Sequence, residues 1–197
     1  MNLFGLFTEG WAVIPSAFTN VEPLVKIAER LSGSFRAAHI GRDNSARLEQ
    51  NVRSDKIMWL DENVDPAVNV YLNQMEAIRE LVNQRCFLGL FDYECHFANF
   101  EPGDFYKTHV DAFADERNPR GNRKLSSVFY LNKDWQPEDG GELVLYAPDS
   151  REEIARVLPQ LGTLVLFLSE EFPHEVLPAR RLRQSLTGWF RTRPQGI

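Results

Sequence analysis

The second half of the chain alternates short segments rich in β-branched and aromatic residues with turns marked by glycine and proline, beginning at Phe91. Such alternation is typical of strands that follow one another at short intervals. The segments expected as strands are residues 93–100, 105–111, 125–131, 142–147, 153–158, 163–168, 173–177 and 185–192. So many short strands predict a β-sandwich or a barrel.

The first half holds two segments with helical periodicity. Asn20 is placed to cap a helix that runs to about Leu31, and Asp65 followed by Pro66 predicts a helix over residues 66–84. Its apolar residues form a stripe suited to packing on a sheet, namely Val68, Tyr71, Leu72, Met75, Ile78, Leu81 and Val82. Shorter strands are expected at residues 11–14, 34–38 and 56–60, and a polar loop at 41–51.

These elements predict a mainly β fold with the N-terminal helices packed on the outside of one sheet. A chain of 197 residues suits one domain, so we expect a single unit over 1–197. Residues 1–90 would support a β core at 91–192.

Composition limits the kinds of partner that the protein can bind and indicates the cell compartment in which it works. The net charge of −6 argues against broad nucleic-acid binding, although a local basic patch stays open. We find no apolar run near the ~20 residues of a membrane helix and no basic leader, which favours a cytoplasmic protein. Cys86 and Cys95 are too few for a disulfide framework and are expected to be small buried hydrophobes. We expect a monomer or a weak dimer.

His109 and Asp111 stand two positions apart, which puts both side chains on one face of an extended strand. His174, at the head of a later strand, could complete the set. Two imidazoles and one carboxylate on one face of a metal are the ligands of non-haem Fe(II) oxygenases. The other histidines have plainer interpretations: His39 lies beside the polar loop, and His96 suits a half-buried, hydrogen-bonded position in a strand.

An arginine nine residues after His174 suggests a second ligand, because an arginine fork captures a carboxylate such as that of a 2-oxo acid. Arg180, Arg181 and Arg183 compete for this role, and Arg183 would open the strand that follows the Pro178 turn. Zinc tolerates the same ligands and would give a hydrolase. The arginine favours the 2-oxo acid.

The sequence resembles the Fe(II)/2-oxoglutarate dioxygenases, and within them the prolyl hydroxylase domain proteins: the animal hypoxia-sensing enzymes and their bacterial relatives. Besides the three metal-ligand positions and Arg183, the resemblance rests on RSDKIMW at 53–59, VFYLNKDW at 128–135, GGEL at 140–143, PHEVLPA at 173–179 and LTGWF at 186–190. It spans about Arg53 to Arg191. The bacterial members look most similar, through FLGL at 87–90.

The resemblance implies a double-stranded β-helix, or jelly roll, that holds Fe(II) through His109, Asp111 and His174. It implies that Arg183 binds the far carboxylate of 2-oxoglutarate with help from the Tyr130 hydroxyl. The pocket would be lined by Val128, Leu143, Val176 and Trp189. Dioxygen would be the oxidant, and ascorbate a reductant.

Several family members carry a cosubstrate-binding tyrosine where this chain has Phe100, and Tyr106 could replace it. The resemblance also implies that a loop around 41–52 closes over a peptide, with Arg53 and Asp55 at its base and Trp189 beside it. The implied reaction is 4-hydroxylation of a prolyl residue in a protein, with release of succinate and carbon dioxide. The bacterial relatives suggest elongation factor Tu.

Two other readings stay open. The same cofactors could serve hydroxylation of another side chain, a free amino acid or a nucleobase, the last disfavoured by the negative charge. Alternatively, the jelly roll could be a non-catalytic module that binds metal or 2-oxoglutarate. The basic run Arg180, Arg181, Arg183, Arg191 and Arg193 could steer an acidic partner or could be solvated surface.

Overall fold

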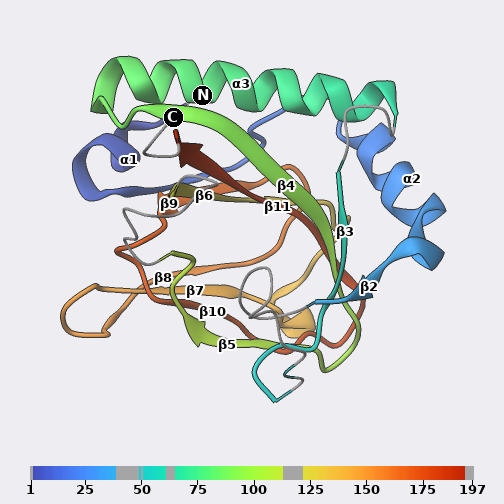
Figure 1. The fold of residues 1–197 in the computed structure, drawn as a ribbon. Coiled ribbons are helices and arrows are strands. Elements are labelled where there is room, and N and C mark those ends of the chain that lie inside the picture. Colours follow the sequence, from blue (N-terminus) through green and yellow to red (C-terminus); the bar gives the residue numbers. More distant parts are fainter. Residues whose placement is uncertain (1, 39–48, 50, 61–64, 113–121, 194–197) are drawn as a thin grey trace.

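Two antiparallel sheets pack against each other in the computed structural model, which describes residues 2–38, 49, 51–60, 65–112 and 122–193 (Figure 1). The larger sheet has the strand order β1-β9-β6-β11-β4-β3-β2. Its strands are β1 (Trp11–Ile14), β2 (Arg36–Ala37), β3 (Lys56–Trp59), β4 (Leu90–Phe100), β6 (Arg123–Tyr130), β9 (Leu164–Leu168) and β11 (Arg183–Thr192). The smaller sheet, ordered β5-β10-β7-β8, contains β5 (Tyr106–His109), β7 (Leu143–Tyr146), β8 (Glu153–Val157) and β10 (His174–Val176).

The predicted long helix is confirmed as α3 (Pro66–Cys86), which lies along the outer face of the larger sheet in Figure 1. The Asp65 carboxylate accepts a hydrogen bond from the Ala67 amide at 3.0 Å, as expected of an N-cap. Leu81 is 37% exposed, so it lies outside the stripe to which the periodicity assigned it. The buried stripe consists of Val68, Tyr71, Met75, Ile78 and Val82.

The N-terminal elements differ from the sequence prediction in two places. The short helix α1 (Phe4–Glu9) had no strong signal and was not expected. Helix α2 spans Glu22–Arg30, and Val21 occupies its N-cap without a side-chain bond. Asn20 does not cap it, because its backbone is left-handed, with φ 59°. Strand β2 is shorter than expected because a 3₁₀ turn at Ser32–Ser34 precedes it.

Two layers of apolar side chains account for the architecture. One layer lies between the helices and the outer face of the larger sheet, and includes Met75, Phe129 and Phe190. The other lies between the sheets and includes Phe167 and Leu145. The mainly β, jelly-roll prediction is confirmed. Within the described ranges, none of the helices has the length and apolar character needed to cross a membrane.

Both thiols are free, as expected, although only Cys95 is fully buried while Cys86 is half-buried. Most of the loop predicted at 41–51 lies outside the described residues, namely residues 41–48 and 50, and so does His39.

Candidate metal centre and cosubstrate pocket

Three side chains predicted as metal ligands converge between the two sheets. One ligand atom each from His109, Asp111 and His174 lies within 4.8 Å of the others. His109 Nε2 is 3.5 Å from Asp111 Oδ1, and His174 Nε2 is 3.6 Å from Asp111 Oδ2. Strands β5 and β10 are paired with His109 opposite His174, so backbone register brings the two imidazoles together.

Each imidazole is oriented by a hydrogen bond at Nδ1, the ring nitrogen that is not turned toward Asp111. His109 Nδ1 lies 2.8 Å from the Lys107 carbonyl oxygen, and His174 Nδ1 lies 3.0 Å from that of Phe172. Nδ1 therefore donates to the backbone and leaves Nε2 as the lone pair for a metal. Burial, together with the nearby His109, lowers the pKa of His174 to about 4, so this imidazole is neutral at physiological pH.

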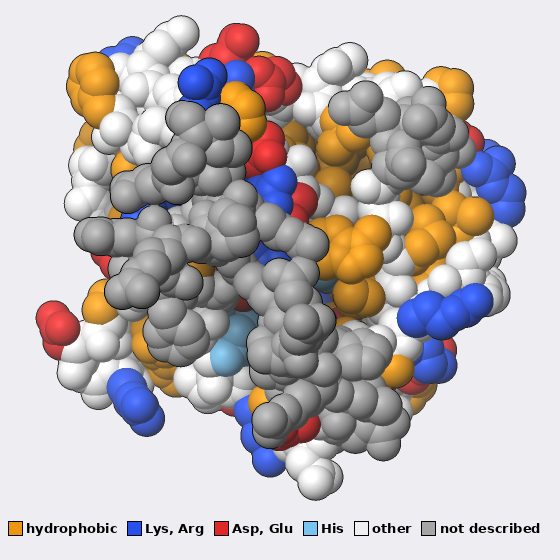
Figure 2. All heavy atoms as spheres, in the orientation of Figure 1, with side chains coloured by type: hydrophobic (Ala, Val, Ile, Leu, Met, Phe, Trp, Pro, Cys, Tyr) orange, Lys and Arg blue, Asp and Glu red, His pale blue; other side chains and the backbone are white. Residues whose placement is uncertain are grey.

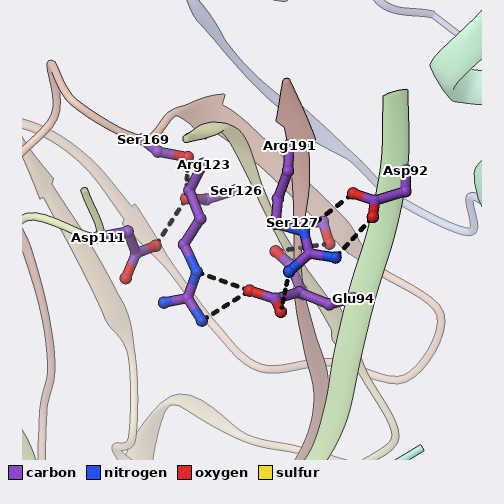
Figure 3. Close-up of polar contacts among 9 residues, drawn as sticks. Asp92, Glu94, Asp111, Arg123, Ser126, Ser127, Ser169 and Arg191 are labelled. Atoms are coloured by element: carbon purple, nitrogen blue, oxygen red, sulfur yellow. Dashed lines mark hydrogen bonds and ion pairs between the residues drawn. The ribbon is translucent and has the colours of Figure 1, made fainter. Parts of the chain in front are cut away.

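Asp111 reaches the cluster by a route that the sequence did not predict. Strand β5 ends at His109, so Asp111 lies beyond the strand and not on its face as expected. The Ser126 hydroxyl donates to Asp111 Oδ2 at 2.6 Å and is itself 2.8 Å from the Ser169 hydroxyl (Figure 3). Burial would raise the pKa of Asp111, but the two histidines and Ser126 outweigh it and hold the pKa well below its usual range.

The serines were missed in the sequence, although a signal for one was present. Ser126 stands two positions before Val128 on one strand, so the two residues share a face. Ser169, in the turn after β9, carried no comparable signal, because only the strand pairing places it beside Ser126.

The competition among the arginines is decided by burial. Arg183 is 1% exposed, and its Nε donates to the Gly141 carbonyl at 2.8 Å. Arg180 is exposed, and the Arg181 guanidinium lies over the Trp135 ring at 4.6 Å. Only Arg183 of these three therefore faces the space between the sheets.

Arg183 and Tyr130 each present a buried polar atom with no hydrogen-bond partner among the described residues, Nη2 and Oη respectively. The Phe100 ring lies 4.9 Å from the Arg183 guanidinium carbon, where the family tyrosine was expected. The apolar residues expected to line this pocket, Val128, Leu143 and Val176, are buried in the same cluster as Tyr130.

The model of the 2OG-Fe(II) oxygenase superfamily matches residues 95–191, which hold all three converging ligands and Arg183. A crystal structure of a Pseudomonas putida prolyl-4-hydroxylase is 41% identical, covers 96% of each chain and superposes with a TM-score of 0.84. The chain belongs to the 2OG-Fe(II) oxygenase superfamily. Within this superfamily its relatives are prolyl hydroxylases, as the sequence predicted.

A prolyl hydroxylase from Trichoplax adhaerens, solved with a hypoxia inducible factor peptide, is 26% identical over 95% of this chain and 86% of that chain, with a TM-score of 0.81. Human Egl nine homolog 1 is 29% identical over 153 residues. That match covers 72% of this chain and 33% of the human protein, so the chain spans about a third of that relative.

The residues present fit the cofactors of the superfamily. Two imidazoles and a carboxylate within 4.8 Å of one another are the donor set of a non-haem iron site. The unpartnered Arg183 Nη2 and Tyr130 Oη offer two hydrogen-bond donors to a carboxylate. Buried polar atoms without partners are rare in folded proteins, so this pair indicates a ligand.

The residues expected to contact substrate fall into two groups. The Arg53 guanidinium donates two hydrogen bonds, of 2.8 and 2.6 Å, to the Asp55 carboxylate, and Asp55 is only 1% exposed. The Arg53 guanidinium also lies 4.4 Å over the Tyr106 ring, which stacks on His109 at 3.5 Å. Arg53, Asp55 and Tyr106 therefore support the predicted metal ligand His109 through the ring stacked on it. Burial raises the pKa of Tyr106 to about 12.

Trp189 belongs to the second group, and the Arg123 guanidinium lies 3.5 Å over its ring. Glu94 holds Arg123 at 2.9 Å and also accepts a bond from Arg191 at 2.9 Å, as Figure 3 shows. Arg191 is further paired with Asp92. The sequence analysis missed this network, because its members lie on three strands that pair only in the folded chain.

The basic run does not form one surface patch. Arg183 is buried, Arg191 is paired with acids, and Arg193 lies over Phe91 at 4.7 Å. On the face drawn in Figure 2, the coloured Lys and Arg side chains are scattered among acidic ones. The structure therefore does not support the interpretation of this run as one basic patch that steers an acidic partner.

Proposed function

We propose that the protein is an Fe(II)- and 2-oxoglutarate-dependent dioxygenase that hydroxylates a prolyl residue of a protein at the 4-position. The observation that carries this proposal is the convergence of His109, Asp111 and His174, whose ligand atoms lie within 4.8 Å of one another. The buried Arg183, whose Nη2 has no partner among the described residues, supports it. The 41% identity to a bacterial prolyl-4-hydroxylase over nearly the whole chain supports the choice of substrate class.

When bound, Fe(II), 2-oxoglutarate and dioxygen supply the oxidation that converts a C–H bond to an alcohol, with release of succinate and carbon dioxide. The chain supplies position and exclusion of water. His109, Asp111 and His174 would hold the metal, and Arg183 with Tyr130 would bind the far carboxylate of the cosubstrate. The apolar lining that excludes water from the 2-oxoglutarate pocket is provided by Val128, Leu143 and Val176. Trp189 faces the side on which the substrate binds.

The finer assignments rest on the relatives and on general chemistry. Elongation factor Tu is our proposed substrate, ascorbate the proposed reductant, and the cytoplasm the proposed compartment. We propose that residues 1–197 act as one domain, as a monomer or weak dimer, with Arg53 and Asp55 at the base of the loop that meets the peptide. Phe100 removes one hydroxyl from the cosubstrate pocket.

The experiment that tests this function is incubation of the protein with Fe(II), 2-oxoglutarate and a cell extract under air. Mass spectrometry should find prolyl peptides that gain one oxygen, and the His109→Ala variant should leave them unmodified. Equal oxidation by both proteins would contradict the proposal.

The remaining alternatives are separated by two readouts. Oxygen gained on another residue would move the substrate assignment and keep the reaction. Anaerobic addition of Fe(II) and 2-oxoglutarate should give a visible charge-transfer absorption in either enzyme. Absence of this absorption together with intact peptide binding would favour the non-catalytic module.

A further inference from the structure

The outer face of the smaller sheet carries a polar cluster on the side away from the predicted metal centre. On β10, His174 and Val176 are buried, so Glu175 between them points to the outer face. The Thr108 hydroxyl of β5 donates to Glu175 Oε2 at 3.3 Å, and the Tyr146 hydroxyl of β7 donates to Oε1. One carboxylate therefore links three strands, β5, β10 and β7, that lie side by side in Figure 1.

Tyr146 holds the carboxylate of Glu175 in place. The hydrogen bond to Glu175 is the main reason that the pKa of Tyr146 is raised to about 12, so the phenol keeps its proton and donates at physiological pH. Glu175 lies opposite Val144, two residues before Tyr146, so this contact is the diagonal one that aromatic side chains reach across an antiparallel pair. With one oxygen bound by Tyr146, the other is turned toward β5.

The pairing of β5 with β10 is irregular beside this carboxylate. Two regular pairs flank the irregularity: His109 with His174, and Tyr106 with Val176. Between these pairs β5 has two residues, Lys107 and Thr108, whereas β10 has only Glu175. Two residues opposing one form a β-bulge, which changes the direction of the side chains beside it. The bulge lies directly before the predicted metal ligand on β5.

The bulge also supplies the hydrogen bond that orients His109. The His109 Nδ1 atom lies 2.8 Å from the carbonyl oxygen of Lys107, which is one of the two bulge residues. The Lys107 N–H donates to the Val52 carbonyl at 2.9 Å, along the opposite edge of β5. The bond from Thr108 to Glu175 is the side-chain contact that ties the bulge to β10. A shift at Thr108 would therefore rotate the Lys107 carbonyl, and the His109 ring with it.

We propose that Glu175 is a positioning residue for the metal centre: bound by Tyr146, it fixes Thr108 and thereby the β-bulge that orients His109. Glu175 acts from the opposite face of the sheet, through Thr108 and Lys107. This inference rests on the proposed function and adds a residue outside the cavity to those that prepare the metal site.

The first test changes only the exposed hydroxyl of Thr108 in the full chain. Thr108→Val keeps the branched shape and leaves the charge of Glu175 in place, but it removes the donor. Calorimetric titration of the metal-free protein with Mn(II) should show a dissociation constant about three- to tenfold higher, the range of one hydrogen bond. Thr108→Ser returns a hydroxyl and should recover most of the affinity.

The second test separates the hydrogen bonds of Glu175 from its charge. Glu175→Leu removes both contacts and should raise the Mn(II) dissociation constant about tenfold or more. Glu175→Gln removes the charge but keeps two polar atoms, and hydroxyls can accept as well as donate, so it should recover most of the affinity. Glu153→Gln is the matched control: it removes a charge from β8, at a 2.8 Å ion pair with Arg156, and should leave Mn(II) affinity unchanged.

A third readout follows the His109 ring by NMR of the metal-free protein with isotope-labelled histidine. The chain has only four histidines, so the ring signals are few. The Nδ1 proton of His109 should exchange faster with water in Thr108→Val, while that of His174, bound to the Phe172 carbonyl, should not change. His96 is the reference ring. It is 2% exposed and its Nδ1 has no partner among the described residues, so the expected half-buried, hydrogen-bonded position is wrong.

Thermal melting of each variant separates positioning from packing. A lower melting temperature with wild-type Mn(II) affinity in Thr108→Val and Glu175→Leu would show a purely structural role and overturn the inference, leaving the proposed function standing. Equal weakening by Glu175→Gln and Glu175→Leu would assign the effect to charge and overturn it as well. If a Glu175 variant does not fold, the Thr108 variants decide. Failure of wild type to bind Mn(II) would instead overturn the proposed function, and the positioning role with it.

Discussion

Replacement of Ser126 by alanine tests whether the serine hydroxyls prepare Asp111 for the metal. Ser126 is 1% exposed and donates to Asp111 Oδ2 at 2.6 Å, a short bond to a charged acceptor. Ser126→Ala removes this bond and also leaves the Ser169 hydroxyl without its partner at 2.8 Å. A hydrogen bond to a charged group contributes about 1.5–3 kcal/mol, so the free energy that holds the Asp111 carboxylate in place falls by roughly that amount.

Because about 1.4 kcal/mol changes an equilibrium constant tenfold, this loss corresponds to a metal dissociation constant about 10- to 100-fold higher. The assay is calorimetric titration of the metal-free protein with Mn(II). This ion is a hard Lewis acid, which suits a carboxylate ligand, and it is stable in air. Ser126→Thr retains a hydroxyl and should recover most of the affinity.

Ser127→Ala is the matched control for this experiment. Ser127 is equally buried but points away from the cavity, with its hydroxyl 2.8 Å from that of Tyr93 and 3.2 Å from the Gly188 carbonyl oxygen. It should lower the melting temperature and leave Mn(II) affinity unchanged. The reasoning is refuted if Ser126→Ala binds Mn(II) as tightly as wild type, or if both alanine variants weaken binding equally.

Three further predictions concern other parts of the site and fold. Arg183→Lys cannot serve the Gly141 carbonyl and a carboxylate together, so the KM for 2-oxoglutarate should rise at least about tenfold while calorimetry shows unchanged Mn(II) affinity; an unchanged KM would count against the pocket. Gly188→Ala places a Cβ 2.4 Å from the Tyr93 hydroxyl, so denaturant melts should show a loss of about 3 kcal/mol or a failure to fold; near-wild-type stability would show that this region relaxes. Because the pKa of His96 is lowered to about 3, the unfolded chain binds its proton first, and the free energy of unfolding should fall by about 1.4 kcal/mol per pH unit for this group as pH drops from about 6.5 toward 3. His96→Phe should remove that share of the slope in denaturant melts, and identical slopes would contradict the assignment.

Local chemistry in the sequence was enough for several elements. Asp65 and Pro66 specify the start of α3 by capping and by a preset φ, which are interactions within a few residues. The alternation of apolar segments and turns predicted a β-sandwich or a barrel, and the family resemblance implied a jelly roll, which is confirmed. The family resemblance rested on His109, Asp111, His174 and Arg183 together with several longer matching stretches, and the comparisons confirm the family.

The remaining features depended on contacts between residues far apart in the chain. Strand β5 ends before Asp111, and it is Ser126 on another strand that holds the carboxylate in the cluster. Residue type alone left three arginines competing for the carboxylate, and the resemblance pointed to Arg183. The structure adds that Arg183 is buried and donates to the Gly141 carbonyl.

The sequence by itself determined which chemical groups the chain carries, where its turns fall and which family it belongs to, because these depend on residue type and short-range spacing. The tertiary structure alone decided that His96 and Trp189 lie on the same face of the larger sheet as Val128 and Ser126. Register between strands is set by backbone pairing across the whole fold, and a shift of one residue would turn either side chain to the opposite face.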